Sequence, residues 1–210
     1  MRTNLLNPLG PRILLASRSA RRRELLTLVG AQFDCYVVDV DERPLPGERA
    51  EAHVLRLAES KARAALAAGA VGPSAEPTAV LGADTIVTID REILGKPGDA
   101  DEAVRMLTRL SGRVHEVWTG ISLLDAADGR SVSEAARSIV KFSRLAPDEI
   151  RRYVATGEPL DKAGAYAVQG LGAVYVEAIE GSYTNVVGLP LSHLKHALKL
   201  LFETPEPRRA

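Results

Sequence analysis

Short apolar runs alternate along the chain with longer segments in which apolar residues recur every three to four positions. The first pattern is typical of buried strands and the second of amphipathic helices. The apolar runs predict strands at 12–16, 33–38, 79–82, 86–89, 114–124 and 138–143. The periodic segments predict helices at 19–29, 48–68, 99–110, 147–156 and 189–202, and a glycine-rich stretch at 165–187 has strand character. Because helices and strands alternate, we expect the α/β class.

The segments between and around these elements indicate how the chain is divided. A length of 210 residues suits one domain, or two lobes that share one core. We expect a single domain at 12–202, with flexible termini at 1–11 and 203–210 that contain several prolines. Residues 39–47 hold three acids and two prolines, and residues 69–78 hold two prolines, so both segments are predicted loops.

One lysine lies where the helical pattern predicts an apolar residue. At 100° per residue, Leu57 and Val54 define one face of the helix predicted at 48–68, and Lys61 falls between them. Burial of an unpaired ammonium costs several kcal/mol, so Lys61 needs an anionic partner or a path to water. The alternative is that its stem is buried while its head reaches solvent.

The first predicted helix shows a similar pattern at its N-terminus. Arg21 and Arg22 project on its apolar side, and Ser17 and Ser19 precede it. That side consists of Leu25, Leu26, Leu28 and Val29. Free backbone N–H groups and forked guanidinium donors together suit a phosphate, and the serines suit a cap or a phosphate contact. The alternative is a solvated basic face.

Acidic residues supply the second half of a candidate site. Asp84 and Thr85 interrupt the apolar run AVLGADTIVTI, and a carboxylate there indicates a strand end, a catalytic group or a metal ligand. Asp39, Asp41 and Glu42 form an acidic cluster in a predicted loop, where simple solvation is the alternative. Separated carboxylates with phosphate oxygens can hold Mg²⁺, which takes few protein ligands.

Composition and charge narrow the function classes. The chain has 46% apolar residues, with 27 basic and 27 acidic residues and zero net charge, so it is predicted to be globular without affinity for nucleic acid or membrane surfaces. The single Cys35 can form neither an internal disulfide nor a thiolate zinc site. With no secretory or membrane-spanning pattern, we expect a cytoplasmic protein. Walker, Rossmann, zincin and nucleophile-elbow motifs are absent from the sequence.

Several ordered blocks together resemble the Maf family of nucleoside triphosphate pyrophosphatases, over residues 12–202. They are LLASRSARRRELL (14–26), DVDER (39–43), LRLAESKA (55–62), LGADTIV (81–87), ILGKP (93–97), LSGRVHEVWTG (110–120), EPLDKAGAYAVQGLGA (158–173) and VVGLPL (186–191). The resemblance implies an elongated mixed β-sheet with flanking helices and two lobes around a cleft, similar to inosine triphosphate pyrophosphatases. It also implies a homodimer, and metal-dependent cleavage of a nucleoside triphosphate to the monophosphate and pyrophosphate.

Three positions indicate a branch of that family. Arg21, Thr85 and Gln169 match the branch that resembles dTTP/UTP pyrophosphatases, whereas the branch acting on 7-methyl-GTP has Trp, Gln and Glu there. These three residues are therefore the expected specificity determinants. One departure is Ala20, where the family usually has a proline that organises the first helical turn.

The resemblance and the misplaced charges together predict a role for each candidate residue. Asp84 is the expected base, and Glu42 with Asp84 would hold Mg²⁺, Mn²⁺ or Co²⁺. The expected triphosphate ligands are Ser17, Arg22, Lys61 and Lys96. Two alternatives stay open, namely a nucleotide-binding regulator of cell division and septum formation with incidental turnover, and an enzyme for modified nucleotides.

Overall fold

The computed structural model describes residues 5–6, 11–71 and 78–202. The predicted terminus 203–210, most of 1–11 and residues 72–77 of the predicted loop therefore lie outside the described residues. Within the first eleven residues, Leu6 is buried in the core and the Leu5 amide donates to the Val29 carbonyl oxygen at 3.0 Å. These two residues belong to the fold and not to a flexible end.

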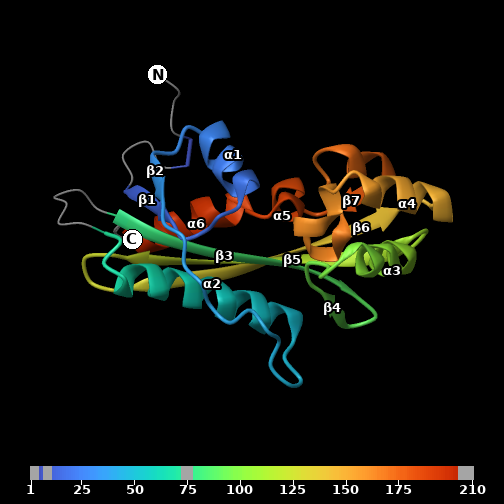
Figure 1. Cartoon of the computed structure of the whole chain (residues 1–210). Helices are drawn as coiled ribbons and strands as arrows, with labels where there is room; N and C mark the ends of the chain where they lie inside the picture. Colours follow the sequence, from blue (N-terminus) through green and yellow to red (C-terminus); the bar gives the residue numbers. More distant parts are fainter. Residues whose placement is uncertain (1–4, 7–10, 72–77, 203–210) are drawn as a thin grey trace, which may run out of the picture.

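A mixed sheet of seven strands forms the centre of the molecule, with the order β2-β1-β3-β5-β6-β7 and β4 paired to β3. The strands are β1 (Arg12–Leu15), β2 (Phe33–Cys35), β3 (Thr78–Ile89), β4 (Glu92–Leu94), β5 (Val114–Asp125), β6 (Ser131–Phe142) and β7 (Val176–Glu180). β1 pairs in parallel with β2 and β3, and the other pairs are antiparallel. The long strands β3, β5 and β6 run from one end of the molecule to the other (Figure 1).

Helices cover both faces of the sheet at one end. Because side chains alternate along a strand, Val80 of β3 packs with Ala62 of α2 (Ala50–Ala67), while Leu81 packs in the cluster that contains Leu26 of α1 (Ala20–Leu28) and Leu194 of α6 (Leu191–Phe202). α2 accordingly lies on one side of the sheet, and α1 and α6 lie on the other (Figure 1). No helix in the described ranges has the length and apolar character needed to cross a membrane.

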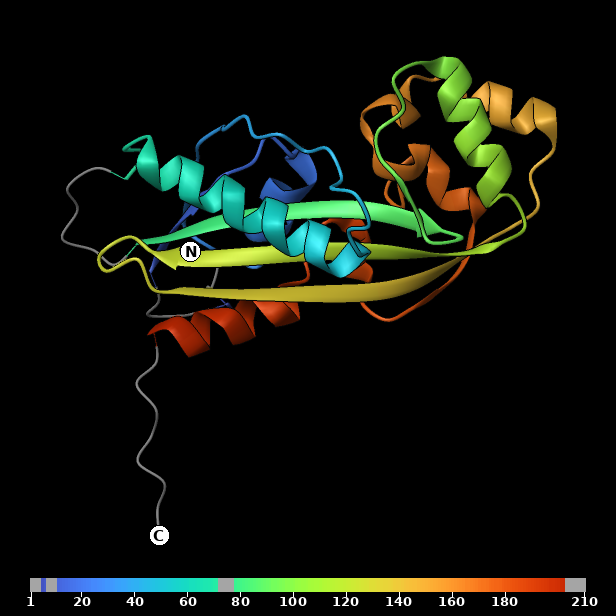
Figure 2. The same ribbon diagram turned by 90° about the horizontal axis from the view of Figure 1, so that it is seen from below.

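A second lobe forms around the other end of the long strands. It contains α3 (Ala100–Leu110), α4 (Pro147–Ala155) and the short 3-10 helices η1 (Glu158–Asp161), η2 (Ala163–Ala165) and η3 (Leu171–Tyr175). A separate cluster of buried residues, including Leu107, Phe142 and Tyr153, is its core. Figure 2 shows the two lobes joined by the long strands, which confirms the two-lobed, elongated mixed sheet.

Two glycines let α2 approach the sheet closely. A Cβ atom on Gly82 of β3 would lie 1.9 Å from the Ala58 carbonyl oxygen, and one on Gly120 of β5 would lie 2.4 Å from the Val54 carbonyl oxygen. Only glycine fits at such distances, and glycine inside a strand often marks such an approach. The two residues set the distance between α2 and the middle of β3.

Several predicted elements differ from the structure. β3 is one strand through Asp84 and Thr85, because β5 pairs with it along this whole stretch. β6 begins at Ser131, seven residues before the predicted start at 138. The sequence pattern missed its first half because that half alternates exposed and partly buried positions and lacks an apolar run. β4 was not predicted, and it follows a turn in which Asp90 and Arg91 both have positive φ.

The glycine-rich stretch 165–187 also differs from its prediction. It consists of η3, the short β7 and the helix α5 (Tyr183–Val187), so only five of its residues form a strand. In α1, Leu25 and Leu26 are buried as expected, but Leu28 is 68% exposed. Leu28 is the last residue of the helix.

Candidate active site

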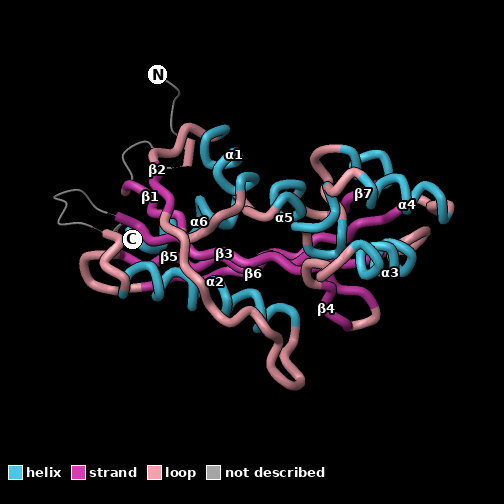
Figure 3. Tube along the Cα trace, in the orientation of Figure 1, coloured by secondary structure: helices cyan, strands magenta, loops and turns pink. Residues whose placement is uncertain are grey.

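The central strand β3 has an uncovered edge next to Asp84. On this side β1 pairs with residues 78–81 of β3, and β4 pairs with residues 87–89. Between them, residues 82–86 have no strand partner on that edge within the described part of the chain. β1 and β4 lie at opposite ends of this gap (Figure 3). The gap opens into a pocket of about 1220 Å³ that is lined by both lobes.

The pocket gathers all but one of the predicted site residues. The residues that line it include Ser17, Arg21, Arg22, Glu42, Lys61, Asp84, Thr85 and Lys96. Gln169 is the exception, because its neighbours Ala167 and Val168 line the pocket and Gln169 does not. The Gln169 Oε1 atom is buried with no hydrogen-bond partner among the described residues.

Lys61 bridges two carboxylates at the uncovered edge of β3. Its Nζ atom lies 2.7 Å from Asp84 Oδ1 and 2.6 Å from Glu42 Oε1. The Lys61 and Asp84 side chains are only 10% and 11% exposed, whereas Glu42 is half exposed. The buried lysine therefore has the anionic partner that its position required, and the alternative of a solvated head is wrong. Partial burial opposes ionisation of Glu42, but Lys61 outweighs it and lowers the pKa of this carboxyl.

The Arg22 guanidinium is held from three sides. Its Nε donates to the Gly188 carbonyl oxygen at 2.8 Å, NH1 donates to Ser17 Oγ at 3.0 Å, and NH2 donates to Thr85 Oγ1 at 3.0 Å. Ser19 caps the helix by accepting from the Arg22 backbone N–H. Burial lowers the pKa of Arg22, and the nearby Asp84 opposes that effect. The side chain is 8% exposed, so a cation of fixed orientation forms part of the pocket wall.

Alternation along β3 separates the two polar residues of the strand. Asp84 points toward α2 and Lys61, whereas Thr85 points toward Arg22 on the other face of the sheet. Thr85 Oγ1 also lies 2.9 Å from Thr119 Oγ1. The hydroxyl of Thr85 is thus engaged with protein groups, and both faces of the sheet reach the same pocket at the uncovered edge.

A buried carboxylate outside the predicted site fixes the acidic loop. Glu48 accepts hydrogen bonds from Arg56 at 2.6 Å, from the Leu45 amide at 3.0 Å, and contacts His53 Nδ1 at 2.9 Å. The hydrogen bond from Arg56 is the largest cause that holds the pKa of Glu48 well below its usual range. Arg56 also donates to the Arg43 carbonyl oxygen at 3.2 Å, so this cluster holds the loop that carries Glu42.

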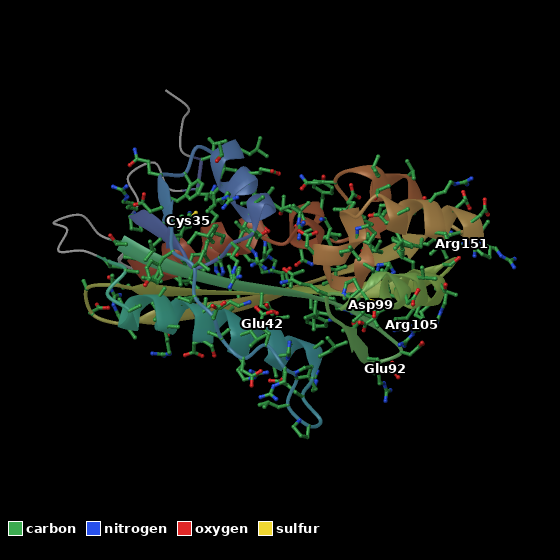
Figure 4. All side chains as sticks on the ribbon, in the orientation of Figure 1. Cys35, Glu42, Glu92, Asp99, Arg105 and Arg151 are labelled. Atoms are coloured by element: carbon green, nitrogen blue, oxygen red, sulfur yellow. The ribbon has the colours of Figure 1, made fainter. Side chains whose placement is uncertain are left out.

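The second lobe supplies the opposite wall of the pocket. Lys96 lies after β4, and Arg105 on α3 and Lys162 after η1 also line the pocket. Lys162 Nζ donates to the Glu158 carbonyl oxygen at 3.0 Å and pairs with Asp161. Figure 4 labels Glu42 at the first lobe and Glu92 and Arg105 at the second. Cations from both lobes therefore face the space between them.

Comparison with known proteins places this arrangement in a family. A family model described as Maf-like protein matches residues 12–201. The chain belongs to the Maf family.

Curated relatives of this Maf chain share about half of its residues. The dTTP/UTP pyrophosphatase of Geobacter sp. (strain M21) is 54% identical over 189 residues, which cover 90% of this chain and 95% of that protein. The dTTP/UTP pyrophosphatase of Citrifermentans bemidjiense is 53% identical over the same length and the same shares. Among solved structures, that of the Staphylococcus aureus Ham1 protein aligns with 14% identity and a TM-score of 0.39, covering 62% of this chain and 71% of that chain.

The carboxylates of this Maf chain suit a divalent cation that binds together with a substrate. Within the described residues no group of three or more His, Cys, Asp or Glu side chains could hold a metal by itself. Glu42 and Asp84 each bring one oxygen within 2.7 Å of Lys61 Nζ, so the ammonium lies between the two carboxylates in this structure. Two carboxylates fit Mg²⁺ or a similar ion, which completes its shell with water and phosphate oxygens.

Proposed function

We propose that this chain hydrolyses dTTP and UTP to the nucleoside monophosphate and pyrophosphate. The observation that carries the proposal is the Asp84–Lys61–Glu42 group at the uncovered edge of β3, in which Asp84 and Lys61 are nearly buried, with Arg22 held beside it in one pocket. Phosphoryl transfer requires chiefly positioning and charge neutralisation, which this set of side chains offers. The names of the relatives, at 54% and 53% identity, support the choice of substrate.

In this proposal the cations of both lobes bind the triphosphate. Three of the five Arg22 N–H groups are bonded within the protein, so two are left for phosphate oxygens. Ser17 Oγ accepts from Arg22 and from the Ser19 amide, so its own proton is available to donate to a phosphate oxygen. Lys61 and Lys96 approach from α2 and from the second lobe.

Asp84 acts on the attacking water. A water oxygen attacks the α-phosphorus, the bond from that phosphorus to the bridging oxygen breaks, and pyrophosphate leaves. Asp84 takes the proton of the water, while Lys61 Nζ donates to its Oδ1 at 2.7 Å. A divalent cation held by Glu42 and Asp84 would neutralise phosphate charge.

The specificity residues divide into two kinds in this proposal. Arg21 lines the pocket, where its guanidinium would contact the substrate directly. Thr85 acts through Arg22, because its hydroxyl accepts from that guanidinium. Gln169 would contact the pyrimidine edge, because a side-chain amide can both donate and accept a hydrogen bond; its buried Oε1 atom has no protein partner among the described residues.

The test is pyrophosphate release from a panel of nucleotides with Mg²⁺, Mn²⁺ and Co²⁺. We expect kcat/KM for dTTP and UTP to exceed that for GTP, ATP and 7-methyl-GTP by at least about tenfold. Tight binding of dTTP without turnover would instead support a nucleotide-binding regulator. The homodimer stays a prediction from the family resemblance, and the cytoplasmic location stays a prediction from the sequence pattern.

A further inference from the structure

We propose that Thr119 and Asn185 are positioning residues for Arg22, and that their hydrogen bonds fix the guanidinium in the orientation that binds phosphate. The inference rests on the proposed function, in which Arg22 contacts the triphosphate. Both side chains are fully buried, with 0% exposure, and neither lines the pocket. They therefore influence a substrate only through the residues that they touch.

The hydrogen bonds that link Arg22, Thr85, Thr119 and the Asn185 carbonyl oxygen each have one possible direction. Thr119 Oγ1 donates its only proton to the Asn185 carbonyl oxygen at 3.0 Å. It can then only accept from Thr85 Oγ1, 2.9 Å away. Thr85 in turn has donated its only proton and accepts from Arg22 NH2 at 3.0 Å. The hydrogen bonds run in one sense, from Arg22 through both threonines to the Asn185 carbonyl oxygen.

A second path from Arg22 ends at the same carbonyl. Arg22 Nε donates to the Gly188 carbonyl oxygen at 2.8 Å, and the Gly188 amide donates to the Asn185 carbonyl oxygen at 2.9 Å. The two paths form a closed ring through the Nε and NH2 atoms of the guanidinium. Gly188 has a φ of 120°, a backbone conformation that favours glycine at this turn. Rotation of Arg22 breaks both paths at once.

The Asn185 amide anchors this ring to the sheet. Its Nδ2 atom donates to the Val117 carbonyl oxygen of β5 at 3.0 Å and to Ser138 Oγ of β6 at 2.9 Å. Ser138 also donates to the Ser182 carbonyl oxygen at 3.1 Å, before α5. An asparagine supplies the two protons that these acceptors need, and an aspartate cannot. The turn that orients Arg22 is thus fixed to two long strands of the sheet.

Replacement of Thr119 by valine should free the Arg22 guanidinium to rotate, with little change in the volume of the buried side chain. Valine has nearly the shape of threonine, but it leaves the Thr85 proton without the Thr119 oxygen that accepts it. Thr85 then turns that proton elsewhere and ceases to be a fixed acceptor for Arg22 NH2. Binding and catalysis depend on such fixed orientation, so the cost appears in the substrate affinity and in the rate.

The experiment is a double-mutant cycle measured with dTTP. Thr119→Val is placed in the wild type, in Arg22→Lys and in Lys96→Met, and Thr119→Ser is the matched control that keeps the hydroxyl. We expect T119V to lower kcat/KM by about tenfold in the wild type and in K96M, and by less than about twofold in R22K. T119S should restore most of the activity. The affinity for inorganic pyrophosphate, measured by calorimetry, should follow the same pattern without any turnover.

Two results would overturn the inference. One is wild-type kinetics and pyrophosphate affinity in T119V. The other is an equal loss in the R22K and K96M backgrounds, which would show that Thr119 serves only general stability. Failure of the proposed function looks different, because the wild type would then release pyrophosphate from no nucleotide. The calorimetric cycle would still decide whether Thr119 acts through Arg22.

Discussion

The Lys61 ammonium lies 2.7 Å from Asp84 Oδ1, and both side chains are nearly buried. α2 brings the lysine to this point because Gly82 and Gly120 let the helix approach the sheet. Glu42 reaches the same ammonium from a loop. A buried pair of this kind is a weak source of net stability, but removal of either member leaves an uncompensated charge. Its position at the pocket therefore points to chemistry, and each member can be tested separately.

Asp84→Asn should lower kcat for dTTP by about 100-fold or more, since the proposed base is lost. The amide retains the shape of the side chain, so the circular dichroism spectrum should remain that of the wild type. Asp90→Asn, six positions further along the chain at the β3–β4 turn and outside the pocket, is the matched control. Near-wild-type kcat in D84N would remove Asp84 from the catalytic role.

Lys61→Met should destabilise the protein as well as raise KM. The apolar face of α2 suits methionine, but Asp84 would be left buried without its cation, at a cost of about 3 kcal/mol in unfolding free energy. Arg63→Met, on the exposed face of the same helix, should cost less than about 0.5 kcal/mol. The double variant K61M/D84N should recover part of the lost stability in urea unfolding. A K61M variant as stable as the wild type would show that the pair is not coupled.

Glu48→Gln should destabilise the loop that carries Glu42. The side chain of Glu48 is 7% exposed and bonded to Arg56 and His53, so we expect a loss of about 2 kcal/mol. The folded-state pKa of Glu48 is depressed, so its stabilisation is present above the ordinary value of 4.5 and is lost as the pH falls below it. E48Q should therefore flatten the acid side of the stability profile. Glu59→Gln, in an exposed pair with Arg63, should leave that profile unchanged.

His115 should make the stability depend on pH in a different window. Burial lowers the pKa of His115 to about 4, from an ordinary value of 6.5. Between these values the unfolded chain binds a proton that the folded protein does not, so the unfolding free energy rises with pH and is then constant above 6.5. The full change is about 3 kcal/mol. His115→Gln keeps a partner for Tyr166 but does not titrate, and equal pH slopes in both proteins would contradict this account.

The sequence was most informative where a residue contradicted its local pattern. Lys61 on an apolar helix face and Asp84 inside an apolar run each indicated a site, and the structure places them in contact. The sequence also contains a signal for the close packing of α2. Gly82 and Gly120 lie in predicted strands, and the structure places them in β3 and β5.

Other parts of the site depend on contacts that no local pattern contains. Thr119 and Asn185 look like ordinary residues of a strand and a turn, and their partners lie dozens of positions away in the chain. Glu48 looks like a solvated acid at the first position of a predicted helix, yet its side chain is only 7% exposed and pairs with Arg56 and His53. The first half of β6 could not be predicted because it has no apolar run. Its strand conformation depends on hydrogen bonding to β5, which pairs with it from Ser131 onward.

The products of dTTP hydrolysis in ¹⁸O-labelled water test the central claim most directly. Attack on the α-phosphorus predicts dTMP that carries the label and pyrophosphate that does not, formed in equal amounts by the wild type and nearly absent with D84N. Release of dTDP and inorganic phosphate, or label in the pyrophosphate, would contradict the proposed reaction.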